Sequence, residues 1–181
     1  AHPWLDGPKD SYLGYSAKGG GALCEHSHGL NFWQHLSNQL KLGRIEEVNA
    51  ELFSFKDQKV DYDKLVIASL KTESGHYGDL IQDVVTFPTI KKSKVQGDKR
   101  YAEIEINVNN TDIITTGGIN ESPSKKLIKK TRPDDFIWEV EHIISLINGE
   151  ITDSPIALIR GIETMCVIEA IFRSSKERKP V

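Results

Sequence analysis

Alternation of apolar and polar residues, with a period of two, runs through the middle of this 181-residue chain and constrains its fold most strongly. Apolar side chains occupy every second position of 48–52 and of 102–108. This is the pattern of strands that have one wet face. Further strands are expected at 64–72, 77–87, 112–116 and 126–130. Gly75 lies between the first two of these and predicts a hairpin there.

Helices are predicted on both sides of this run of strands. Apolar residues recur at helical spacing from about Gly20 to Leu42, and a second helix is expected to follow Pro133. A third is expected to start with Ser154 as its cap and Pro155 as its first residue. Strands segregated from helices indicate an α+β fold with a largely antiparallel, open-faced sheet and helices on one face. We expect residues 1–181 to form a single domain of this kind.

Composition narrows the classes of partner. The net charge is −3, which weighs against nucleic acid because phosphate neutralisation needs a basic face. The sequence has no apolar run of membrane-spanning length, so no membrane partner is expected. Two cysteines, Cys24 and Cys166, are too few for a disulfide framework and predict a reduced, cytoplasmic protein. The sequence has neither a G-x-G-x-x-G fingerprint nor a Walker loop, so this chain alone is not expected to hold a nucleotide.

A glycine triplet, Gly19-Gly20-Gly21, opens into the first predicted helix and marks the candidate site. Glycine lets a ligand approach the backbone closely, and titratable groups gather just beyond it. On one continuous helix Glu25 and His28 would lie about 60° apart on one face. A carboxylate beside an imidazole suits a group that moves a proton on or off a hydroxyl. His26 would point about 100° away from Glu25.

Two other interpretations of this cluster stay open. Glu25, His26 and His28 are also compatible with a structural role, as exposed helix residues of which the glutamate offsets the helix dipole. A metal site is the weakest alternative, because these residues lack the i, i+4 spacing usual for helical ligand pairs. We therefore expect no bound metal.

Three stretches of the chain resemble the glucose-fructose oxidoreductase / inositol dehydrogenase / MocA family, and only its C-terminal domain. Residues 19–32, GGGALCEHSHGLNF, resemble its site helix, in which glycines precede an acid and a histidine. Residues 136–144, FIWEVEHII, resemble its penultimate helix. Residues 161–181, which include VIEAIFRSS, resemble its closing helix and tail.

The resemblance implies the substrate-binding and oligomerisation domain of an NAD- or NADP-dependent oxidoreductase that acts on sugars, sugar derivatives or polyols. A Rossmann domain would precede Ala1 and hold the cofactor, which agrees with a chain that begins without methionine. His28 would match the catalytic histidine and Glu25 the acid that helps to hold substrate. Trp4, His26 and Asn31 are the expected further substrate contacts. The open sheet face would join copies into a homo-oligomer.

The sequence departs from the family pattern within the site helix. The acid is Glu25 where aspartate is common, and His28 follows it by three residues where many members have four. Asn31 stands where an acid often sits. These departures favour an alternative, a non-catalytic binding or assembly module that kept the fold without the chemistry.

Overall fold

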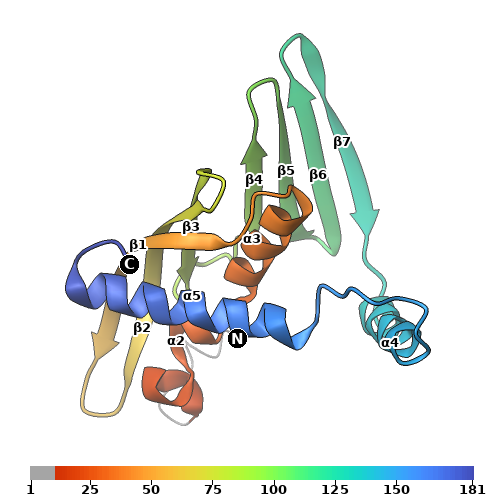
Figure 1. The fold of residues 1–181 in the computed structure, drawn as a ribbon. Helices are drawn as coiled ribbons and strands as arrows, with labels where there is room; N and C mark the ends of the chain where they lie inside the picture. Colours follow the sequence, from red (N-terminus) through yellow and green to blue (C-terminus); the bar gives the residue numbers. More distant parts are fainter. Residues whose placement is uncertain (1–10) are drawn as a thin grey trace. The chain divides into compact units, whose positions relative to one another are not determined.

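The computed structural model describes residues 11–181, which fall into two compact units (Figure 1). The first unit comprises Ala1–Val85 and Pro155–Val181, and the second comprises Thr86–Ser154. Trp4, a predicted substrate contact, lies outside the described residues. No helix of residues 11–181 is both long enough and apolar enough to cross a lipid bilayer.

The first unit is built on a three-stranded antiparallel sheet, in the order β1-β2-β3. Ala50 of β1 pairs with Ala68 of β2, which pairs with Leu80 of β3. The side chains of Val66 and Leu70 are fully buried on one face of β2 beneath helices. Its elements are η2 (Tyr12–Gly14), η3 (Ser16–Lys18), α2 (Gly21–Cys24), α3 (His28–Gln39), β1 (Ile45–Lys56), β2 (Asp61–Thr72), β3 (Tyr77–Asp83) and α5 (Leu158–Glu177).

The outer edge of β1 is covered by the end of the chain. The Ala50 N–H donates to Ser174 Oγ over 2.9 Å, and the Leu52 N–H donates to Ser175 Oγ over 3.0 Å. Val181 pairs with Val48 through both backbone groups, at 2.8 and 2.9 Å. These contacts satisfy the N–H groups that an edge strand leaves open, and they fix α5 along the sheet.

The second unit is a four-stranded antiparallel meander followed by a helix. Its elements are β4 (Lys92–Gln96), β5 (Arg100–Val108), β6 (Thr111–Gly118), β7 (Glu121–Lys129) and α4 (Asp134–Ile147), and the strands pair in chain order. Asn109 and Asn110 link β5 to β6 with φ of 51° and 60°. Asparagine tolerates this left-handed region, which tight hairpin turns require.

The predicted α+β class and the antiparallel pairing are confirmed, although the strands of residues 11–181 divide between two open sheets. Strand β4 was not predicted. The last helix begins at Leu158 and not at Pro155, because Ser154 is engaged elsewhere: its hydroxyl lies 2.7 Å from His142 Nε2. The prediction of one helix from Gly20 to Leu42 was wrong at 25–27, where a turn separates α2 from α3.

Candidate active site

Other parts of the chain fill the space beside two residues of the glycine triplet, Gly20 and Gly21. Gly21 has a φ of 94°, and a Cβ on it would collide with the carboxylate of Asp63. A Cβ on Gly20 would collide with the backbone carbonyl of Leu13. The prediction that the glycines admit a ligand was therefore wrong for Gly20 and Gly21, because η2 and β2 fill the space beside them, whereas a Cβ on Gly19 would meet nothing within 4 Å.

Asp63 explains why the glycines are needed. Its side chain is 2% exposed, so the carboxylate requires internal hydrogen bonds. It accepts the Leu23 N–H over 2.7 Å and the Ser16 hydroxyl over 2.7 Å. The glycines thus allow the first turn of α2 to pack against a buried carboxylate, and this contact fixes the position from which the chain continues to α3.

Gln82 of β3 interrupts the helix between α2 and α3. Its side-chain Oε1 accepts the Leu30 N–H over 2.9 Å, and its side-chain Nε2 donates to the Ala22 carbonyl over 3.2 Å. In a continuous helix these two backbone groups would both bond to residue 26, so the inserted amide opens the ladder. Gly29 leaves room for it, because a Cβ there would meet Gln82 Oε1 at 2.5 Å. As a result α3 begins at His28.

His28 is exposed and lines an open cavity of about 820 Å³ between the start of α3 and α5. Asn31, one turn further on, lines the same cavity and donates from Nδ2 to Thr164 Oγ1 over 3.4 Å. The α5 wall is mainly apolar and includes Ile162 and Met165. An imidazole and an amide on a mainly apolar wall can orient a ligand hydroxyl and exchange a proton with it.

The other predicted site residues lie differently. Glu25 and His26 are half-buried and do not line this cavity. The Glu25 carboxylate accepts the Tyr12 hydroxyl over 2.7 Å, and this hydrogen bond is the main cause of a raised pKa of Tyr12. The structure thus brings together His28 and Asn31 on the cavity wall, and it pairs Glu25 with Tyr12 beside them.

The helix α5 supplies the part of the cavity that the sequence analysis did not identify. Thr164 is 7% exposed and donates to Gln34 Oε1 over 2.8 Å, which joins α5 to α3. The neighbouring residue on α5, Glu163, does not line this cavity and forms ion pairs with Arg44 at 3.0 Å and with Arg160 at 3.3 Å. No local pattern in the sequence points to this packing, because 130 residues separate Gln34 from Thr164.

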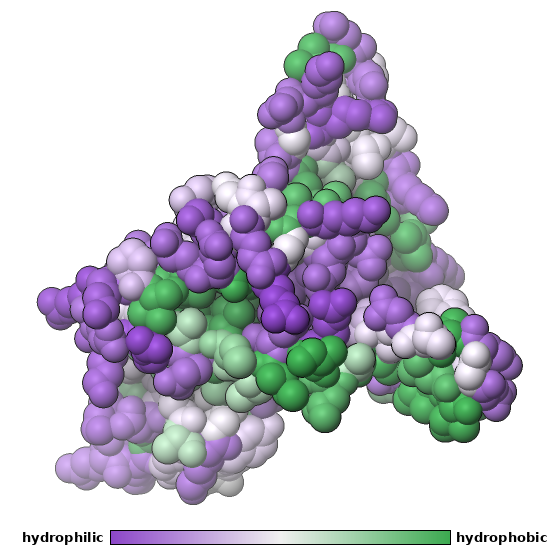
Figure 2. Space-filling model, viewed as in Figure 1, coloured by the Kyte–Doolittle hydropathy of each residue, from purple (hydrophilic) through white to green (hydrophobic). Residues whose placement is uncertain are grey.

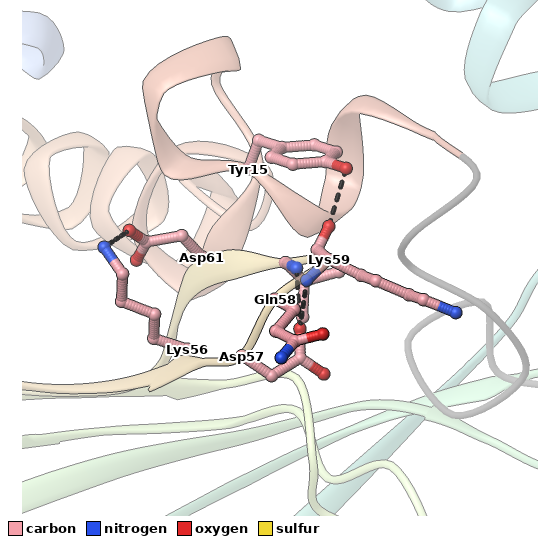
Figure 3. Close-up of a pocket in the computed structure, with 7 residues that line it drawn as sticks. Tyr15, Lys56, Asp57, Gln58, Lys59 and Asp61 are labelled. Atoms are coloured by element: carbon pink, nitrogen blue, oxygen red, sulfur yellow. Dashed lines mark hydrogen bonds and ion pairs between the residues drawn. The ribbon is translucent and has the colours of Figure 1, made fainter.

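A second cavity, of about 500 Å³, surrounds the β1–β2 turn, and its polar groups contact each other (Figure 3). The Tyr15 hydroxyl donates to the Lys59 carbonyl over 2.7 Å. Lys56 and Asp61 form an ion pair at 2.6 Å. Asp57 Oδ1 accepts the backbone N–H groups of the turn. Groups that stabilise a turn in this way leave little for a ligand, so the cavity beside His28 is the better candidate site.

The cysteines differ in their exposure. Cys24 and Cys166 are both free thiols. Burial, and then the charge of Asp63, raises the pKa of the Cys24 thiol. Cys166 is exposed and lines the cavity beside His28. Within residues 11–181 no three His, Cys, Asp or Glu side chains are grouped as metal ligands.

Comparison with solved structures finds this fold in oxidoreductases. Aldose-aldose oxidoreductase from Caulobacter crescentus, complexed with glycerol, matches with a TM-score of 0.77 and 19% identity, over 96% of this chain and 51% of its own. An NAD binding oxidoreductase from Klebsiella pneumoniae matches with a TM-score of 0.74 and 19% identity, over 94% and 53%. Levoglucosan dehydrogenase, in complex with NADH and levoglucosan, gives 0.76 and 14%, over 94% and 53%.

These neighbours are oxidoreductases of the type that the sequence motifs resemble, so the predicted resemblance is confirmed at the level of the fold. The chain spans about half the length of each of them. No protein-family model and no curated protein matches the sequence.

Proposed function

We propose that this chain is the substrate-binding half of an NAD- or NADP-dependent oxidoreductase that transfers hydride to or from a carbon of a sugar, sugar derivative or polyol. The observation that carries the proposal is the position of His28, exposed on an open cavity at the start of α3. Half-length fold matches to an aldose-aldose oxidoreductase and a levoglucosan dehydrogenase support the substrate class.

The residues of this chain do not fit the dinucleotide. Both sheets of residues 11–181 are antiparallel, whereas dinucleotide sites are built on parallel sheets with a glycine fingerprint, which the sequence lacks. We therefore assign the cofactor to a separate Rossmann domain, the expected partner of this chain.

In this proposal His28 exchanges the proton. When an alcohol carbon loses a hydride and becomes a carbonyl, its hydroxyl must also release a proton. The His28 imidazole takes that proton, and in the reverse direction it returns it. Asn31 orients a neighbouring hydroxyl through its amide. Glu25, the proposed acid that helps to hold substrate, and His26, a proposed substrate contact, are half-buried just before α3. Trp4 stays a proposed substrate contact from the sequence alone.

A second copy of the chain is the proposed partner of the open face of the β1–β3 sheet. Ile67 and Ile81 pair across β2 and β3 on this face, and they are 43% and 67% exposed. Phe53 of β1 is exposed on the same face. Changing Ile81 to Lys should shift the protein towards a smaller species in light scattering. The cytoplasm is the proposed location.

The test of the function compares two histidines of α3 in the protein that also carries its nucleotide-binding domain. His28→Ala should lower kcat by about 10²–10⁴-fold, the usual contribution of a general acid or base, with NAD(P)H followed spectroscopically over a panel of sugars and polyols. His35→Ala is the matched control, because His35 is exposed on the same helix and does not line the cavity. Unchanged turnover in His28→Ala would remove His28 from the mechanism.

The alternative, a binding module without chemistry, is favoured by one observation: the Glu25 carboxylate bonds Tyr12 and does not face the cavity. The same assay separates the two proposals. A protein that binds a sugar but reduces no NAD or NADP with any member of the panel is such a module.

A further inference from the structure

One carboxylate, that of Glu169 on α5, lies on the wall of the cavity that holds His28. Five residues of α5 that line this cavity recur at intervals of one, three or four and form one stripe along the helix: Leu158, Gly161, Ile162, Met165 and Glu169. Glu169 ends the stripe and is its one ionisable acid. It is exposed, whereas its neighbour Ile168 is 4% exposed and packs in the core.

Contacts between α3 and α5 join the two helices beside the cavity that His28 and Glu169 both line. Asn38 of α3 contacts Arg160 of α5 at 3.5 Å, and Gln34 contacts Thr164 at 2.8 Å, so the later part of α3 meets the earlier part of α5. One turn back along α3 from Asn31, which contacts Thr164, is His28. Glu169 lies just over one turn further along α5 from Thr164, and both His28 and Glu169 line the cavity beside this contact.

The chemistry of the three polar groups defines a class of ligand. An imidazole donates or accepts, an amide does both, and an ionised carboxylate only accepts. A ligand with several neighbouring hydroxyls can satisfy all three groups at once. We propose that Glu169 is a substrate-binding residue whose carboxylate accepts a hydrogen bond from a hydroxyl next to the one that His28 serves, which rests on the function proposed above.

Glu169 is a carboxylate in addition to the one that the sequence pattern selects. Glu25 already accepts the Tyr12 hydroxyl and does not line the cavity. Glu163, also on α5, is occupied by Arg44 and Arg160. Glu169 is therefore the carboxylate best placed to meet a polyol beside His28.

Alkylation of Cys166 provides a direct assay of the cavity. Cys166 is exposed on the same wall, so a bound polyol should slow its reaction with iodoacetamide. Cys24 is the internal reference: it is half-buried and its raised pKa keeps it in the thiol form, so its rate is lower and rises as the pH approaches that pKa. Mass spectrometry of the 181-residue chain follows both sites in the presence of D-glucose, myo-inositol or levoglucosan, each used alone.

We expect at least one of these three probes to protect Cys166, and Glu169→Gln to raise the half-protecting concentration about tenfold, the cost of one hydrogen bond to a charged group. Glu177→Gln, on the same helix and away from the cavity, is the control and should match the wild type. Glu169→Asp, which keeps the charge, should recover part of the protection. In the protein with its nucleotide-binding domain, Glu169→Gln should raise KM about tenfold with kcat little changed.

Three outcomes would overturn this role of Glu169. The first is that no probe protects Cys166, and the second is that Cys166 is protected as well in Glu169→Gln as in the wild type. The third is that Glu169→Gln unfolds at the temperature of the assay, so that its lost protection reflects lost folding. None of these depends on the turnover of His28→Ala. If His28→Ala loses turnover while Glu169→Gln behaves as the wild type, the proposed function stands and the assignment of Glu169 fails. If Glu169→Gln loses protection while turnover in His28→Ala is unchanged, the cavity binds polyols but the catalytic proposal fails.

Discussion

The two units bury their apolar side chains to very different extents. Within residues 11–181 every buried hydrophobic side chain belongs to the first unit, and those of Leu23, Leu30 and Leu70 have no exposed surface. In the second unit the helix α4 buries no residue. Leu146 is half-buried, and the other large apolar side chains of α4 are exposed by 40% at Ile143 to 79% at Ile147. Figure 2 shows hydrophobic side chains gathered on this helix.

This difference in the burial of apolar side chains determines which unit can hold a site rigidly. Helices cover one face of the first sheet, and the resulting core fixes α3 and α5, which form the cavity around His28. A site needs supporting residues whose positions are locked by packing. The second unit has strand pairing and exposed ion pairs, so its apolar helix is suited to contact and not to the precise placement of reacting groups.

The largest expected effect comes from the core of the first unit. Leu70→Ala should lower the free energy of unfolding by about 2–5 kcal/mol, because it removes a fully buried side chain and leaves a cavity. The matched change in the second unit, Leu127→Ala, affects a side chain that is 66% exposed and should cost less than about 0.5 kcal/mol. Urea unfolding followed by circular dichroism measures both. Equal losses would break the comparison.

An intermediate effect is expected at the interruption between α2 and α3. Gln82→Ala leaves the Leu30 N–H and the Ala22 carbonyl without their partner, which should cost about 1–3 kcal/mol for buried groups. The equivalent polar contact in the second unit is the Arg100–Glu121 ion pair at 2.8 Å, both of whose side chains are largely exposed. Arg100→Ala should cost about 0–1 kcal/mol.

Hydrogen exchange at the start of α3 sharpens this second test. If Gln82 positions His28, exchange of the Leu30 amide should accelerate in Gln82→Ala before exchange in β1 does. Uniform acceleration across both elements would mean that Gln82 contributes only to global stability and has no specific role in placing the site.

Much of the fold was predictable because the repeats of apolar residues that mark its helices and strands lie within short segments of the sequence. The alternation over 48–52 became part of β1, and the alternation over 102–108 became part of β5. The strand β4 was missed because Lys92–Gln96 has a single apolar residue, Val95, and it is a strand only through its pairing with β5. The split of the strands into two sheets is a matter of long-range pairing, which no local period encodes.

The site was only partly predictable for the same reason. The motif drew attention to His28 and Asn31, and both lie on the cavity wall. The geometry between Glu25 and His28 assumed an unbroken helix, which Gln82 interrupts from β3. The glycines suggested an approaching ligand, and the group that approaches is Asp63. Each of these side chains comes from a strand far along the chain, so spacing within the motif could not reveal it.

The smallest effect on stability is expected on α4. Ile147→Ser changes a side chain that is 79% exposed, and near the end of a helix serine costs a few tenths of a kcal/mol in propensity, about 0.5 kcal/mol at most. The exposed apolar surface should instead drive association, so light scattering at increasing protein concentration should show less self-association in Ile147→Ser. Glu139→Gln, a polar change on the same helix, is the control. A loss of stability as large as that of Leu70→Ala would mean that α4 is packed against apolar surface in the folded protein. The two units would then differ in what their apolar side chains pack against, and not in how much apolar surface they bury.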